Sequence, residues 1–219
     1  MMAAAVEARA ASGSLDVYGG VTLHRPVEVS VSETSGSGTN SATGSIDVSN
    51  TGEIGLRMQG WLPSHDWFGL ALDVGYFQAH GPGVNISAYP FSMLMVLRAP
   101  LFASPERPEG WLQPYAMAGV SFYLVDINNV ELEGMGGSNT FKWELAGPCA
   151  TVGLAWQLTR SLGLFGECRY SAFEVGFDTT DSMIWPTMNG RVDVSLSSAH
   201  ALIGLSHPIG GRTAAVPGR

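Results

Sequence analysis

Residues 52–78, GEIGLRMQGWLPSHDWFGLALDVGYFQ, decide the fold of this chain, because they alternate in polarity on both sides of a short turn. Apolar residues or glycine occupy every second position across 54–62, with Arg57 and Gln59 among the residues between them, and 68–76 alternate in a similar way. The residues between, 63–66, are types that form turns. Since successive side chains of a strand point to opposite faces, this stretch predicts a hairpin of two strands, each with one apolar face and one polar or small face.

The same alternation recurs along the chain and predicts eight strands in all. Six segments carry it besides the hairpin: 15–23, 85–101, 111–125, 150–158, 164–172 and 191–207. A long mobile loop or frayed extension is expected at 28–51, and a second long loop at 128–145. The last strand has no clear phase, because Ser198 and His200 interrupt both of its faces, and a bulge there would explain the slip. No helix is expected.

The composition limits the classes of protein to which the chain can belong. Charged residues make up 14% of the 219 residues, below the ~25% usual for soluble domains. The net charge of -8 argues against nucleic acid as a partner, because nucleic acid selects for a basic surface. The two cysteines, Cys149 and Cys168, set no disulfide framework, and the sequence predicts neither a metal site nor a cofactor. No run approaches the ~20 apolar residues of a membrane-spanning helix.

The chain divides into three parts. Residues 1–14 are expected to be a disordered leader, 15–209 the β-barrel domain, and 210–219 a C-terminal tail. The leader is small and polar, and it lacks the apolar run of a secretory signal. Either a signal was removed from this sequence, or its start is placed too late, or the protein is never exported, which would favour a soluble barrel.

Two kinds of closed barrel fit eight alternating strands, and they differ in which face lies inside. A soluble, lipocalin-like barrel turns its apolar face inward around a ligand, whereas a membrane barrel turns it outward to lipid and carries aromatic girdles. The continuous apolar faces approach the ~9–11 residues that a tilted strand needs to cross a bilayer. An aromatic belt would consist of the tryptophans beside the short turns: Trp61, Trp67, Trp111 and Trp156. The sequence therefore predicts an all-β fold, a closed eight-stranded antiparallel up-and-down transmembrane β-barrel, with the soluble ligand-binding barrel as the alternative.

The opposite faces carry charged residues that a membrane barrel would enclose. These are Glu53, Arg57, Asp73, Arg98, Glu167 and Arg169. An eight-stranded barrel is only wide enough for side chains to fill, so these residues must pair with one another or with trapped water. The favoured interpretation is a salt-bridged plug, and the alternative is a gated, narrow ion path that opens when partners are exchanged. Glu167 and Arg169 are expected to point the same way and to find partners on neighbouring strands.

Three segments resemble a known group of proteins. Residues 111–123, WLQPYAMAGVSFY, resemble the "PYxGAGxGxxY" strand of small outer-membrane barrels of the OmpA, OmpW and opacity-protein group. Residues 88–100, AYPFSMLMVLRAP, resemble the preceding strand of that group, and 162–170, LGLFGECRY, its "LxLxxExRY" strand. The chain departs from the group at Met117, where glycine is preferred, and at its end, because it continues past Ile209 where members end on an aromatic residue.

The resemblance implies a location and a role. It implies the outer membrane of a Gram-negative bacterium, with both termini periplasmic and the long loops outside. Its partners would be outer-membrane lipid and lipopolysaccharide, the barrel-assembly machinery, and an extracellular ligand bound through the loops. The implied role is structural or in surface interaction, with a porin-like channel or a transporter of small or apolar solutes as the alternative.

Catalysis is a further alternative, and the sequence argues against it. Some lipid-A-modifying enzymes are eight-stranded barrels with a His/Ser pair, and here Ser198 and His200 share a strand with Asp193. Residues two apart on a strand have side chains about 6–7 Å apart, which is beyond hydrogen-bond reach. The His-x-Ser order of those enzymes is also reversed, so no enzymatic activity is predicted.

Overall fold

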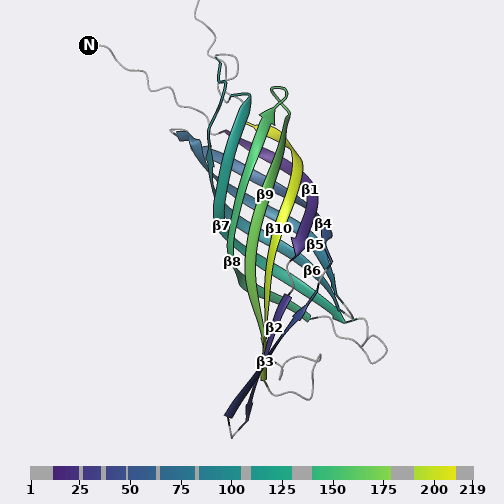
Figure 1. The fold of residues 1–219 in the computed structure, drawn as a ribbon. Helices are drawn as coiled ribbons and strands as arrows, with labels where there is room; N and C mark the ends of the chain where they lie inside the picture. The colour runs from purple at the N-terminus through teal and green to yellow at the C-terminus, as the bar shows by residue number, and fades with distance from the viewer. Residues whose placement is uncertain are drawn as a thin grey trace, which may run out of the picture.

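The computed structural model describes a single antiparallel β-sheet of ten strands (Figure 1). The described residues are 12–24, 27–35, 38–47, 49–62, 65–81, 84–104, 110–129, 140–178 and 190–210. The strands are β1 (Ser12–His24), β2 (Val27–Ser35), β3 (Gly38–Ile46), β4 (Thr51–Leu62), β5 (His65–Gly81), β6 (Val84–Arg98), β7 (Leu112–Asn129), β8 (Thr140–Gln157), β9 (Gly163–Asp178) and β10 (Gly190–Ile209). Within those ranges the chain forms no helix, and hence none with the length and apolar character to span a membrane.

Eight of the strands close into a barrel. Their order around the ring is β1, β4, β5, β6, β7, β8, β9 and β10, and β10 pairs with β1 from Gly13↔Ile209 to His24↔Ser198. Closure leaves the ring without an edge strand, so neighbouring strands satisfy the backbone of the wall. The predicted fold, a closed eight-stranded antiparallel barrel, is confirmed. β1 begins at Ser12, so the last three residues of the predicted leader belong to the wall, while 1–11 and 211–219 lie outside the described residues.

The expectation of a mobile loop at 28–51 is wrong for most of that segment. β2 and β3 form a hairpin from Val27↔Ile46 to Ser35↔Gly38, and β2 also pairs with the first residues of β10, from Gly190↔Glu33 to Ser195↔Glu28. The alternation VEVSV at the start of β2 is typical of a strand, and the surrounding Ser and Thr residues obscured it. Figure 1 shows this hairpin projecting beyond one end of the barrel.

The second expected loop, 128–145, is also shorter than predicted. β7 continues to Asn129 and β8 begins at Thr140, and the two pair at Ile127↔Thr140. Strands in this sheet therefore extend well beyond the segments with a strong apolar alternation.

The predicted bulge in the last strand is absent from the described pairing of β10. Its register with β9 runs without a break from Arg191↔Asp178 to Ser206↔Gly163. Ser198 and His200 both lie on the buried face of β10, where their side chains hydrogen-bond to each other inside the barrel. Register shifts occur elsewhere, between Trp61 and Leu62 and between Val120 and Phe122.

The apolar face of the wall is outside. Large apolar side chains such as Ile54 and Ile203 are 64% and 61% exposed, whereas charged side chains on the opposite faces are buried. The lumen, which is the space enclosed by the eight strands, has an apolar sector on β5–β8. Its buried residues are Ala71, Leu94, Val96, Met117 and Cys149. A second, smaller apolar cluster consists of Tyr18, Phe165 and Leu202. The buried charged residues also lie in the lumen, so the candidate site is inside the barrel.

Candidate functional site

A network of ion pairs crosses the middle of the lumen, centred on Arg57 of β4. The register places Arg57 opposite Asp73 of β5, and its Nε donates to Asp73 Oδ2 at 2.9 Å. Its Nη1 and Nη2 donate to Glu167 of β9 at 2.8 Å and 2.6 Å. A guanidinium presents its donors in a planar fork, which lets one side chain join two carboxylates.

Arg169 of β9 completes this central network. Its Nη2 lies 2.9 Å from Asp73 Oδ2 and 3.1 Å from Glu167 Oε1. Glu167 and Arg169 do point the same way, but their main partners are not on neighbouring strands as expected. β9 and β5 occupy opposite positions in the ring of eight strands, so the Arg169–Asp73 pair spans the lumen. A long side chain reaches the far wall because a barrel of eight strands is so narrow.

Two tyrosines that sequence reasoning missed belong to the same network. The Tyr18 hydroxyl donates to Asp73 Oδ1 at 2.7 Å, and the Tyr115 hydroxyl donates to Glu167 Oε2 at 2.7 Å. The Tyr18 ring also lies 5.4 Å and 5.1 Å from the guanidinium carbons of Arg57 and Arg169. Strand parity could have found both tyrosines, since each alternates with outward-facing residues on its strand.

A second cluster, the histidine layer, lies beside the central network toward the β2–β3 end. His200 Nδ1 is 2.5 Å from Glu53 Oε2, and its Nε2 is 2.8 Å from Ser198 Oγ and 3.0 Å from Ser171 Oγ. The Thr22 hydroxyl donates to Glu53 Oε2 at 2.9 Å. Glu53 links the two groups, because its Oε1 lies 3.6 Å from Arg169 Nη1.

The spacing argument against a Ser198–His200 hydrogen bond is wrong. The separation of about 6–7 Å applies to the positions along the strand, and the imidazole folds back along β10 far enough to contact the hydroxyl. The carboxylate that contacts the imidazole is that of Glu53, and the side chain of Asp193 lies outside the described ones. The order carboxylate, imidazole, hydroxyl is that of a nucleophile-activating triad. Ser198 is only 1% exposed, however, so in this conformation the hydroxyl does not face a space that a substrate could enter.

Arg98 and Trp61 do not take their predicted places. The Arg98 guanidinium carbon lies 3.7 Å from the Trp61 ring centroid, and Nη1 donates to Gln113 Oε1 at 3.2 Å. Trp61 has the same strand parity as Arg57, so its ring faces the lumen instead of joining an outer belt. Arg98 therefore lies in the lumen at the short-turn end, outside the central network.

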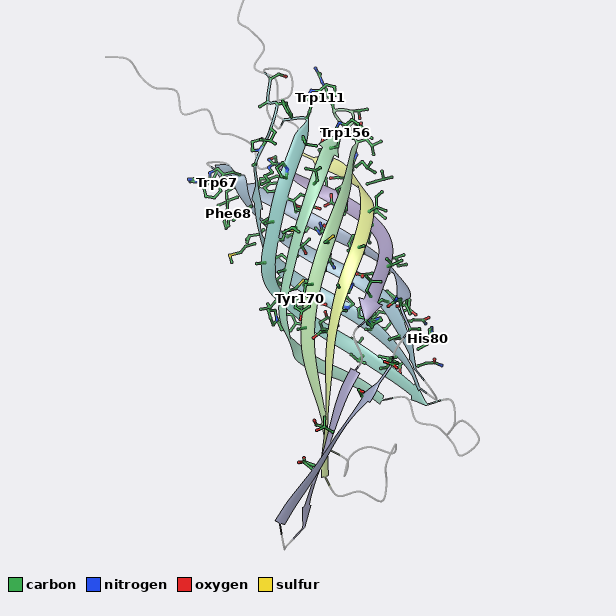
Figure 2. The ribbon with its side chains drawn as sticks, in the orientation of Figure 1. Trp67, Phe68, His80, Trp111, Trp156 and Tyr170 are labelled. Carbon is green, nitrogen blue, oxygen red and sulfur yellow. The ribbon has the colours of Figure 1, made fainter. Side chains whose placement is uncertain are left out.

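The other three belt tryptophans lie on the outer surface. Trp67, Trp111 and Trp156 are 50%, 46% and 49% exposed. Figure 2 shows all three at one end of the barrel, with Tyr170 near its middle and His80 toward the other end. Among the described residues, no three His, Cys, Asp or Glu side chains are arranged to hold a metal ion.

Comparison with known proteins bears on the fold. No protein-family model and no curated protein matches this sequence. The structure of the outer-membrane protein OprG from Pseudomonas aeruginosa is similar, with 16% sequence identity and a TM-score of 0.59, over 91% of this chain and 97% of OprG. Neisserial surface protein A is also similar, with 12% identity and a TM-score of 0.52, over 90% of this chain and 96% of that protein. The chain has the fold of the small eight-stranded outer-membrane β-barrels.

Proposed function

We propose that this chain is a bacterial outer-membrane barrel with a structural or surface-interaction role, whose lumen is plugged by its ionic network. Two features support the membrane location: the exposed apolar wall, and the tryptophans on the outer surface at one end. Both termini would be periplasmic, because Ser12 and Ile209 lie at the short-turn end, opposite the β2–β3 hairpin.

The observation that carries the surface role is the β2–β3 hairpin. Among the described residues, β3 is the last strand of the sheet and pairs with β2 alone. Its sequence, GTNSATGSI, has neither the lysine nor the proline with which proteins protect an edge strand. Such an edge can accept an extended strand of another protein through main-chain hydrogen bonds. The hairpin projects beyond the barrel, where a partner outside the cell would meet it.

Ion pairs between side chains of opposite walls support the plug. Arg57 and Arg169 each connect carboxylates from different sides of the ring, and the side chains of the central network are almost fully buried. Ions could not pass this layer without breaking several buried ion pairs, and breaking one such pair costs about 3–5 kcal/mol.

The surface role is tested by deleting the hairpin. Residues 27–46 are replaced by a two-residue turn, and the adherence of cells carrying the barrel to immobilised proteins is measured. We expect adherence to be lost while the barrel remains folded, as judged by its gel mobility before and after boiling. A barrel with Ser41, Thr43 and Ser45 changed to Ala is the matched control and should keep its adherence, since the main chain makes the contact. Unchanged adherence after the deletion would refute this role.

A narrow channel is a second candidate function. It is favoured by two polar atoms of the network that make no hydrogen bond. Glu53 Oε1 and Arg169 Nε are buried and make no hydrogen bond among the described residues. A small shift could therefore exchange partners between Glu53, Asp73 and Glu167 and open a path. Planar-bilayer recording tests this: a channel gives a small, salt-dependent conductance that rises in Arg57→Ala, whereas a plug gives no conductance in the wild type.

A further inference from the structure

A cavity of about 70 Å³ lies inside the barrel at the short-turn end. Every barrel strand except β5 contributes to its lining, which includes Asp16, Gln59, Arg98, Tyr115 and Phe165. A water molecule needs about 10–15 Å³ of such space, so the cavity has room for roughly five waters or a solute of about five non-hydrogen atoms.

One carboxylate oxygen in this lining has no hydrogen-bond partner. Asp16 is only 1% exposed, and its Oδ2 accepts a hydrogen bond from Gln59 Nε2. Its Oδ1 is buried and makes no hydrogen bond within the described part of the chain. The hydroxyls of Ser14 and Ser206 are near enough to interact with the same carboxylate as hydrogen-bond donors, and both residues line the cavity, where their oxygens can still accept a hydrogen bond. A buried carboxylate with an unsatisfied oxygen is costly, so the site favours a donor that enters from the cavity.

Two arginines near this carboxylate make hydrogen bonds to other residues. Arg57 is paired with Asp16 in the strand register, but its Nε, Nη1 and Nη2 donate to Asp73 and Glu167. Arg98 also lines the cavity, where it stacks on Trp61 and donates to Gln113.

Asp16 differs from the other buried acids of the lumen, which among the described residues are Glu53, Asp73 and Glu167. Arg57 and Arg169 lie against those three carboxylates. Glu53 Oε1 also makes no hydrogen bond, but it lies 3.6 Å from Arg169 Nη1. Asp16 is the acid that lines the cavity, where the half-buried Arg98 is the other charged residue.

We propose that this cavity binds a small primary ammonium ion through Asp16 Oδ1. An ammonium group carries three N–H donors, which match the free carboxylate oxygen and the hydroxyls of Ser14 and Ser206. The rings of Tyr115 and Phe165 line the same space and suit the short alkyl part of such an ion. The volume limits the ligand to a few non-hydrogen atoms. The absence of a metal-binding cluster among the described residues makes an organic cation a better fit than a metal ion.

The proposal is tested by titrating the full chain in detergent micelles with ethylammonium chloride. The Gln59 side-chain amide signal is followed by NMR, because this amide contacts Asp16. We expect a saturable shift with ethylammonium. Tetramethylammonium has the same charge but no N–H donor, and it should bind at least about tenfold more weakly, as expected for the loss of a charge-assisted hydrogen bond.

Two variants locate the site. Asp16→Asn should weaken ethylammonium binding by at least about tenfold. Asp47→Asn makes the same charge change at an exposed position outside the lumen, and it should leave binding unchanged. Three results would overturn the proposal. The first is equal affinity of the wild type for the two cations, and the second is equal affinity of Asp16→Asn and the wild type for ethylammonium. The third is no saturable shift, which would indicate a cavity that holds only water. If Asp16→Asn does not fold, the comparison of the two cations on the wild type decides alone.

Discussion

At the scale of single residues, Arg57 is the side chain on which the lumen depends most. Its three nitrogens donate to two carboxylates that come from separate parts of the ring, and its side chain is fully buried. A lysine could not make these contacts, because its ammonium is a single point of charge without the planar fork. The interaction is therefore specific to arginine.

Replacing Arg57 by Ala should destabilise the barrel by about 3–5 kcal/mol, because Asp73 and Glu167 would lose their shared partner while remaining buried. Urea unfolding in detergent, followed by tryptophan fluorescence, measures this. Arg160→Ala, in an exposed turn, is the control and should change stability little. A loss below about 1 kcal/mol in Arg57→Ala, the level of an exposed ion pair, would contradict the account.

Glu53 and His200 should be energetically coupled. Their contact at 2.5 Å is buried, and Ser198 and Ser171 hold the other nitrogen of the imidazole. A double-mutant cycle with Glu53→Gln and His200→Gln should give a coupling energy of about 1.5–3 kcal/mol, the range for hydrogen bonds to charged groups. Additive effects of the two substitutions on unfolding would show that the contact contributes nothing of its own.

At the scale of strands, the interior side chains are accommodated by glycines in the wall. A Cβ atom placed on Gly55 would lie 2.3 Å from the Tyr18 ring, and one on Gly153 would lie 2.3 Å from the Tyr115 ring. These are the tyrosines that donate to Asp73 and Glu167. Small residues on β4 and β8 thus let the phenol groups reach the central network.

Gly55→Ala should destabilise the barrel by about 1–3 kcal/mol, because Tyr18 must move away from Asp73. Gly60→Ala is the matched control on the same strand, since a Cβ there meets nothing within 4 Å. Its effect on urea unfolding should be close to zero or slightly stabilising. If both variants unfold alike, the packing of Tyr18 against Gly55 has no role in stability.

Strand parity accounts for what the sequence could predict, and two features lay beyond it. Alternation in 54–62 predicted an apolar outer face, and the same parity already places Trp61 with Arg57 on the lumen side. The β2–β3 hairpin was missed because Ser and Gly are frequent in it and large apolar residues are few, so the apolar alternation is weak there. The pairing of Arg169 with Asp73 could not be predicted, because it depends on how the eight-strand ring brings β5 and β9 to opposite walls.

At the scale of the whole molecule, the barrel reverses the arrangement of a water-soluble protein. Apolar side chains cover the outer wall along the strands, and the ionic and polar groups meet in the lumen. Because lipid cannot hydrogen-bond the backbone, such a surface is stable in a membrane only if the sheet is closed, as the β1–β10 pairing makes it. In water, the same surface would expose far more apolar area than monomers tolerate.

Gel mobility of the boiled and unboiled protein in detergent, with circular dichroism alongside, shows whether the apolar wall faces lipid. We expect a β-rich protein that needs detergent to stay in solution and runs as a compact band that shifts on boiling. A protein that stays soluble and monomeric without detergent would contradict it, because the apolar faces would then have to lie inside the barrel.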